Sequence, residues 1–87
     1  MLDHGELFRR IRAGNMANVR FADFVSLIQA FGFEAERISG SHHIFRHAVA
    51  PLRLNAQPHH GDAKPYQIRQ FLRLVERHGL AWKNVDE

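Results

Sequence analysis

The sequence predicts an α+β domain in which two helices pack on one face of a three-stranded antiparallel sheet, in the order α-β-β-β-α after a short helical leader. Apolar residues recur at helical spacing in two separate segments, and three short strand-like segments lie between them. With 87 residues the chain has room for one core. We divide it into an N-terminal extension (1–19), one domain (20–80) and a C-terminal tail (81–87).

The leader is expected to be a helix over residues 3–12, with Gly14 after its end because glycine accepts the positive φ common there. We treat it as an appendage to the core. The first core helix is predicted over residues 21–31, and Gly32 ends it. Its apolar side chains follow the i, i+3, i+4, i+7 pattern of one helix face, at Phe24, Leu27, Ile28 and Phe31.

Three strands are predicted next, over residues 33–38, 43–47 and 52–57. A tight turn at 39–41 joins the first two strands, and Gly40 suits it because glycine adopts backbone conformations closed to other residues. The alternation of the first strand is blurred at its end, whereas that of the third strand is clean. One face of the sheet should be buried and the other exposed to water.

The second core helix is predicted to start at Pro65, whose missing N–H has no partner in a first helical turn. Asp62 is the expected N-cap, and Gly79 ends the helix. The buried face again repeats at helical spacing, at Ile68, Phe71, Leu72 and Val75.

Composition excludes several classes of function. The chain has no cysteine, which excludes cysteine-ligated zinc, iron–sulfur clusters and thiol catalysis. No apolar run approaches the roughly 20 residues that span a bilayer, and residues 1–12 lack the apolar core of a signal peptide. We therefore expect a cytoplasmic protein without a membrane partner.

Positive charge is concentrated in the middle of the chain. Between Arg37 and Arg77 there are seven basic and two acidic residues, a net charge of +5. A basic block of this kind indicates a polyanionic partner such as nucleic acid, although mildly basic surfaces are also common in small soluble proteins.

Histidine is the second compositional signal, because five of the seven histidines fall between residues 42 and 60. They could bind a metal, transfer protons, or be surface residues without a special role. Adjacent strand residues point to opposite faces, and His43 and His47 would lie more than about 10 Å apart along a strand. A site joining His42 to His59 and His60 stays open, but zinc sites need three or four converging ligands. We expect no metal and no other cofactor.

Proton transfer suits His42. RNA is cleaved without metal when a base removes the 2′-hydroxyl proton and the 2′-oxygen attacks the adjacent phosphorus. The unperturbed imidazole pKa of about 6.5 leaves both protonation states available near neutrality. His42 follows the glycine turn, where its ring can reach a bound phosphate, and Ser41 can hydrogen-bond a phosphate oxygen. By spacing alone, however, a histidine after a turn is more often a surface residue.

The hexapeptide Gly40-Ser41-His42-His43-Ile44-Phe45 strongly resembles the signature of the HicA toxins, small ribonucleases of bacterial type II toxin–antitoxin pairs. The likeness covers about residues 21–80. The leader and Lys64-Pro65-Tyr66-Gln67 resemble a longer-leader subgroup. The resemblance implies a fold like that of double-stranded-RNA-binding domains, cleavage of mRNA, and a HicB-like antitoxin that covers the active site. It also implies that His42 is the catalytic histidine and His43 a supporting or structural residue.

Basic residues complete the predicted site. Arg37 and Arg46 flank the turn and can neutralise a phosphate under attack. Lys64 lies at the start of the second core helix, where peptide dipoles also favour phosphate. Arg69, Arg73 and Arg77 recur every four residues as a stripe that can contact the RNA backbone, or that is simply a solvated helix face.

We therefore predict a toxin that is an RNA endonuclease (mRNA interferase) using metal-independent acid–base chemistry with a single histidine. The alternative is a non-catalytic module of the same fold that binds double-stranded RNA or docks a partner protein.

Overall fold

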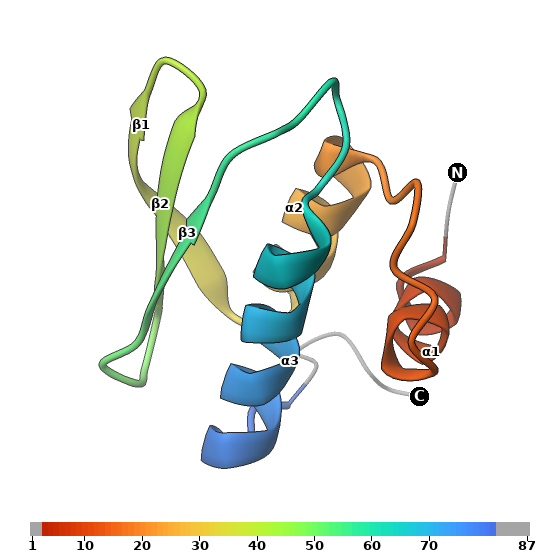
Figure 1. Cartoon of the computed structure of the whole chain (residues 1–87). Coiled ribbons are helices and arrows are strands. Elements are labelled where there is room, and N and C mark those ends of the chain that lie inside the picture. The colour runs from red at the N-terminus through yellow and green to blue at the C-terminus, as the bar shows by residue number, and fades with distance from the viewer. Residues whose placement is uncertain (1–2, 82–87) are drawn as a thin grey trace.

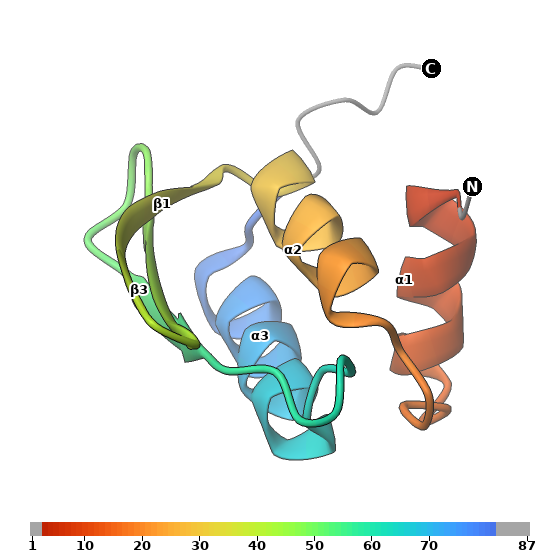
Figure 2. The same cartoon turned by 90° about the horizontal axis from the view of Figure 1, so that it is seen from above.

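The computed structural model describes residues 3–81 and has three layers. A three-stranded sheet forms the first layer, helices α2 and α3 form the second, and α1 lies on the side of the helices away from the sheet (Figures 1 and 2). The elements in chain order are α1 (His4–Arg12), α2 (Phe21–Ala30), β1 (Phe33–Ser39), β2 (His42–His47), β3 (Arg53–Ala56) and α3 (Pro65–His78). The predicted fold class is confirmed, with each predicted helix and strand present.

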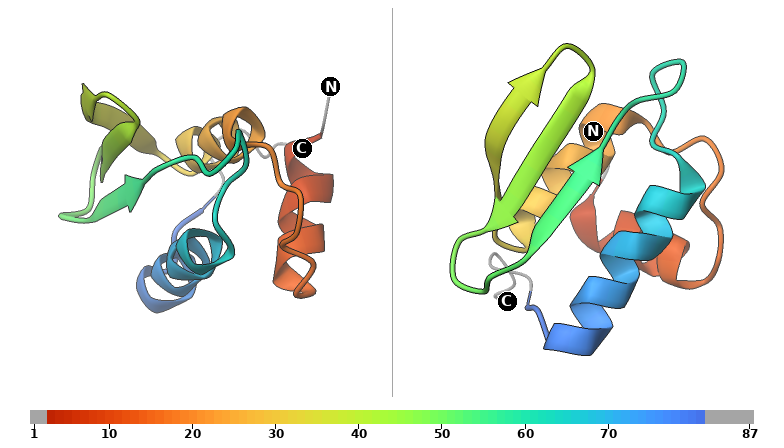
Figure 3. Two further views of the ribbon diagram at one scale, coloured as in Figure 1. Left: turned by 45° about the horizontal axis from the view of Figure 1, so that its top comes forward. Right: turned by 60° about the vertical axis from the view of Figure 1, so that its left-hand side comes forward.

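The sheet is antiparallel, with strand order β1-β2-β3 (Figure 3). The register between β1 and β2 shifts between Ala35 and Arg37, so that one extra residue, Glu36, lies on β1. Such a bulge reverses the alternation of side chains along a strand. It explains why the end of the first strand lacks a clean alternation in the sequence.

One face of the sheet carries the core. Phe33, Phe45, Leu54 and Ala56 point toward α2 and α3 and are almost completely buried. Since residues two apart on a strand share a face, His42, Ile44 and Arg46 lie on the opposite, outer face. No described element covers that outer face (Figure 1). The prediction of one buried and one wet face is therefore confirmed for β2, β3 and the start of β1, whereas β1 beyond Phe33 is exposed on both faces.

The leader helix is part of the core. Asp3 caps α1 by accepting a hydrogen bond from the Gly5 N–H, and Leu7 and Ile11 are 1% and 0% exposed. The Phe8 ring packs against Phe31 at a centroid distance of 4.9 Å. The appendage expected from the sequence thus joins the same apolar cluster as α2, α3 and the sheet.

The start of α3 differs from the prediction. Lys64, not Asp62, is the N-cap residue, and no side chain caps the helix. Asp62 instead forms backbone bridges with Arg20 and His59, which hold the loop before α3 against the start of α2. Asp62 therefore contributes backbone hydrogen bonds to the loop, and the prediction that it is the N-cap of α3 was wrong.

None of the helices in residues 3–81 has the length and apolar character that a membrane-spanning helix needs. Of the predicted tail, only Ala81 falls within the described residues.

Candidate functional site

Three segments far apart in the sequence border one hollow, namely the start of β2, the end of β3 and the start of α3. In Figure 1 the turn between β1 and β2 lies at the top, and the end of β3 and the start of α3 lie below it, near the middle of the molecule. The antiparallel register explains this arrangement, because His43 pairs with Ala56 and thereby brings the start of β2 to the end of β3. The Gly-Ser-His-His segment therefore faces the start of α3.

The turn presents its residues to solvent. Gly40 has a φ of 61°, in the left-handed region that favours glycine. Ser41 and His42 follow it, both exposed, and His42 is the first residue of β2. The Ser41 hydroxyl accepts a hydrogen bond from the Gln57 side-chain amide at 3.3 Å. Its own proton stays available for a phosphate oxygen, since a hydroxyl donates as well as accepts.

The structure separates the histidines of β2 by their contacts. His43 points to the core side, where Nδ1 lies 3.0 Å from the Ser41 carbonyl and the ring packs edge-on against Phe21. The His47 ring lies between Phe31 and the turn after β2, with hydrogen bonds at both nitrogens. Among residues 3–81, by contrast, no protein group hydrogen-bonds the His42 ring. His42 is thus the one histidine of this strand whose imidazole is free to act on a ligand.

A hollow of about 270 Å³ opens beside His42. It lies between the β2–β3 end of the sheet and the first turn of α3, and its lining is mostly polar. The residues around it are His42, His43, Ile44, Asn55, Ala56, Gln57, Tyr66 and Gln67. We call this hollow the His42 pocket.

A buried glutamine supports the wall of the His42 pocket. Gln67 is only 4% exposed, and its side-chain oxygen accepts the Gln57 backbone N–H at 3.2 Å. Gln57 in turn donates to Ser41. This chain of hydrogen bonds connects α3 to the turn that carries His42, so the helix positions the turn.

The predicted phosphate-binding residues divide into two groups. Arg37 pairs with Ile44 across the strands and shares the outer face with His42. Lys64 lies just before α3 with its ammonium 5.8 Å from the centre of the Tyr66 ring, at the edge of the His42 pocket. Arg46 lies four residues along β2, about 13 Å from His42 at ordinary strand rise. It lines a different hollow, near the β2–β3 turn. The structure thus brings Arg37 and Lys64 to the His42 end of the fold and leaves Arg46 at the other.

Arg69, Arg73 and Arg77 are all exposed on α3, opposite the buried Ile68 and Phe71. Their spacing places them in one row along the helix. Tyr66 precedes this row by three residues, so the row begins beside the His42 pocket and runs toward the far end of α3.

An ion pair modifies the charge of the outer face. The Arg53 guanidinium hydrogen-bonds both carboxylate oxygens of Glu36, at 2.8 and 3.1 Å. This hydrogen bonding lowers the pKa of Glu36 below its usual 4.5 and raises that of Arg53. Arg37 and Arg46 make no such hydrogen-bonded pair in the described part of the chain, although the charge of Arg46 also helps to lower the pKa of Glu36.

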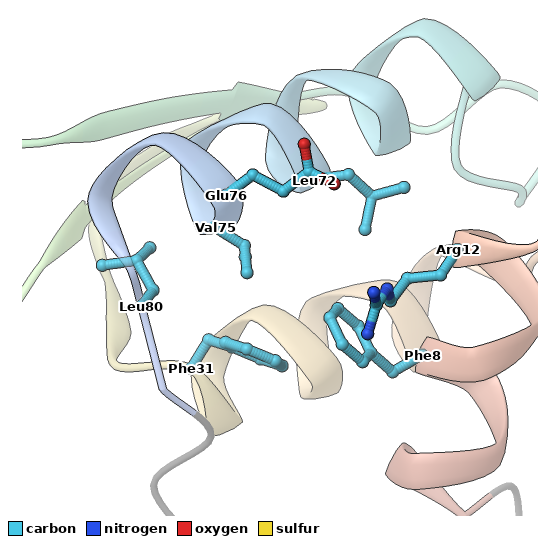
Figure 4. Close-up of a pocket in the computed structure, with 7 residues that line it drawn as sticks. All are labelled: Phe8, Arg12, Phe31, Leu72, Val75, Glu76 and Leu80. Atoms are coloured by element: carbon cyan, nitrogen blue, oxygen red, sulfur yellow. The ribbon is translucent and has the colours of Figure 1, made fainter.

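A second hollow, of about 320 Å³, lies between α1, α2 and α3 (Figure 4). Its walls are apolar, with Phe8, Phe31 and Leu72 among them, and only Arg12 and Glu76 at its rim are charged. It is the larger of the two hollows, but no histidine lines it, and its only carboxyl group is that of Glu76 at the rim. We therefore place the candidate site at the His42 pocket.

Within residues 3–81, no three His, Asp or Glu side chains gather where they could hold a metal ion. His59 and His60 pack against each other at 4.3 Å on the loop before α3.

Sequence reasoning missed the polar wall of the His42 pocket. Asn55 and Gln57 were recognised only as the polar residues of an alternating strand, and Tyr66 only as part of a subgroup motif. No local pattern connects them to His42, because strand pairing and the packing of α3 bring them together.

Comparison with known proteins identifies one family. The family model described as the HicA toxin of bacterial toxin–antitoxin systems matches residues 21–76. The matched segment contains the turn, the His42 pocket and the first part of the α3 arginine row, whereas α1 lies outside it. No curated protein and no solved structure matches the chain.

Proposed function

The chain belongs to the HicA family of toxins from bacterial toxin–antitoxin systems, and from this premise we propose that it is an RNA endonuclease that cleaves mRNA in the cytoplasm with His42 as its catalytic residue. The observation that carries the proposal is the state of the His42 ring. It is exposed, bears no hydrogen bond from a described protein group, and lines a polar pocket within the matched segment.

The proposed reaction needs a base and a place for the phosphate. The neutral His42 imidazole takes the proton of a ribose 2′-hydroxyl, and the 2′-oxygen forms a bond to the adjacent phosphorus. The bond from phosphorus to the 5′-oxygen breaks, and that oxygen takes a proton from a water molecule at this exposed site. The hydroxide left by the water takes the proton from the His42 imidazolium, which restores the neutral ring. The products are a 2′,3′-cyclic phosphate and a 5′-hydroxyl, and no metal ion or other cofactor takes part.

Four residues are proposed to hold the phosphate near His42. Gly40 permits the tight turn that presents Ser41 and His42 to the phosphate. Ser41 donates its hydroxyl proton to a phosphate oxygen, and Arg37 and Lys64 supply positive charge. Arg46 is proposed to contact the RNA further along the strand rather than the reacting phosphate.

The exposed row of Arg69, Arg73 and Arg77 is proposed to contact the RNA backbone along α3. Membership of a toxin–antitoxin family pairs the chain with an antitoxin. We propose that this partner is HicB-like and inhibits the toxin by covering the His42 pocket.

The decisive experiment compares the wild type with His42→Ala and His42→Gln in inducible expression and in cleavage of purified mRNA. Both variants should lose growth inhibition and cleavage, while circular dichroism and the thermal midpoint stay unchanged because His42 makes no described side-chain hydrogen bond. His59→Ala, on an exposed loop, is the matched control and should cleave normally. Activity of the wild type should persist in EDTA. Full cleavage by the His42 variants would refute the assignment.

A non-catalytic RNA-binding module is the second candidate, favoured by the basic row on α3, which does not depend on His42. Such a module would bind double-stranded RNA with a steep salt dependence and yield no cyclic-phosphate products. Measuring binding and product formation on the same RNA separates the two candidates.

A further inference from the structure

We propose that the His42 pocket receives a single unstacked nucleobase of the RNA, next to the phosphate that is cleaved, with Tyr66 as its stacking platform. This inference rests on the proposed function and adds to it a base-binding subsite and a class of target. Three features of the pocket support it: an exposed aromatic ring, side-chain amides around it, and a size that suits one ring system.

Tyr66 is the exposed aromatic residue of the site. It lines the pocket, and 54% of its surface remains exposed, so the ring is accessible to a ligand. Its ring is held in place, because the phenol oxygen lies 3.5 Å from the Gln67 side-chain amide and the Lys64 ammonium lies over the ring. A ring that is fixed but exposed is what a nucleobase needs for stacking.

Lys64 gives this ring a second property. Its ammonium, 5.8 Å from the ring centre, is a cation beside a stacking surface. Successive nucleotides alternate base and phosphate, so a base on Tyr66 brings a phosphate within reach of Lys64. Aromatic platforms with neighbouring cations are the usual combination in proteins that bind single strands.

Polar groups around the pocket suit the edge of a base. Asn55 is exposed, and no described residue hydrogen-bonds its side-chain amide. Gln57 donates to Ser41 through its amide nitrogen, which leaves its side-chain oxygen as an acceptor. Together they offer donors and acceptors like those on base edges, so they are positioned to discriminate between bases.

The size of the pocket indicates the kind of target. A hollow of about 270 Å³ is near the lower limit of small-molecule sites, about 300 Å³. It admits one base and not a base pair. A base inside a duplex is stacked and paired, so the target must be single-stranded or locally open at the cleaved position.

The first experiment measures base insertion without cleavage. Short single-stranded RNAs carry 2-aminopurine at successive positions and are titrated with His42→Ala protein. Fluorescence should be quenched at one position, and adding Tyr66→Ala should abolish the quenching and weaken binding about tenfold. Tyr66→Phe, which keeps the ring, should bind within about twofold of the parent. Val49→Ala, exposed in the β2–β3 turn away from the pocket, is the control and should change nothing. A fully paired duplex should show no quenching.

The second experiment follows cleavage in the wild-type background. Tyr66→Ala should slow cleavage about tenfold or more and alter the preferred cut positions, whereas Asn55→Ala should mainly alter the preference. If wild-type protein cleaves and Tyr66→Ala cleaves at the same rate and positions, the base subsite is refuted and the nuclease stands. If wild-type protein never cleaves, the nuclease proposal fails, and the 2-aminopurine titration alone decides the subsite. Equal quenching of 2-aminopurine fluorescence by the proteins with and without the Tyr66 ring would overturn the inference. Unchanged thermal midpoints would show that the variants are folded.

Discussion

His42 and His47 on strand β2 differ in their side-chain contacts. His47 has hydrogen bonds at both ring nitrogens, at 2.9 Å from Nε2 to the Phe31 carbonyl and at 3.2 and 3.1 Å from the Val49 and Ala50 N–H groups to Nδ1. This pattern requires a neutral ring with its proton on Nε2. His47 thus connects the end of α2 to the β2–β3 turn, whereas no group in residues 3–81 hydrogen-bonds the ring of His42, the proposed catalytic residue.

Replacing His47 should therefore destabilise the fold without touching the proposed catalytic group. We expect His47→Ala to lower the free energy of unfolding by about 1–3 kcal/mol, because backbone groups of a partly buried turn lose their partner. Urea denaturation measures this, with His59→Ala as a control that should shift stability by less than about 0.5 kcal/mol. Equal stability of the two variants would contradict the structural role of His47.

At the scale of elements, α3 has two functional faces. Its buried face carries Ile68 and Phe71 into the core, and its exposed face carries the arginine row. Because its first turn also supplies Tyr66 and Gln67 to the His42 pocket, the same helix supports the core, the pocket and the proposed RNA contact.

The arginine row makes a salt-dependence prediction. Each of Arg69→Gln and Arg73→Gln should weaken RNA binding and reduce the slope of log K against log salt concentration by about 0.7–0.9. Arg9→Gln, an exposed arginine on α1, is the matched control and should leave the slope unchanged. Slopes that are equal in all these variants would show that α3 does not contact phosphate.

The ion pair between Glu36 on β1 and Arg53 on β3 leads to a prediction about pH. Hydrogen bonds from Arg53 lower the pKa of Glu36 in the folded protein. The ion pair therefore contributes to stability above pH 4.5, and this contribution is lost as the pH falls through the lowered pKa of the folded state. NMR titration should show the Glu36 carboxyl of the wild type titrating below that of Arg53→Gln. Because the pair is exposed, high salt should narrow the difference. An identical titration in both proteins would contradict it.

At the scale of the whole molecule, the leader helix is the unexpected contributor. It lies outside the segment that matches the family, yet its apolar side chains enter the same core as the matched elements. The three-layer arrangement in Figure 2 follows from this packing.

Shortening a buried side chain of the leader should therefore cost as much as a central core mutation. We expect Ile11→Ala to reduce stability by about 2–5 kcal/mol, which is a large part of the total for a small domain. Arg9→Ala, on the exposed side of the same helix, should change it by less than about 0.5 kcal/mol. Thermal and urea denaturation compare the two. A similarly small effect of Ile11→Ala would mean that α1 is an appendage after all.

The sequence by itself determined the element order, the buried helix faces and the glycine turn. Each of these is a local property: periodic apolar residues specify a helix face, and Gly40 permits the tight turn. The same local signals placed His42 beside that turn. They did not locate the N-cap of α3, because Asp62 pairs through its backbone with Arg20, a residue far away in the chain.

Only the tertiary structure decided which side chains surround His42. Strand register brings Asn55 and Gln57 to β2, and the packing of α3 adds Tyr66. Hydrogen bonds with the end of α2 and with the β2–β3 turn engage His47, whereas no described group hydrogen-bonds the His42 ring. These relations join residues distant in sequence, and no local periodicity encodes them. The fold could therefore be predicted from the sequence. The residues that line the pocket and the different hydrogen bonding of His42 and His47 depend on long-range packing.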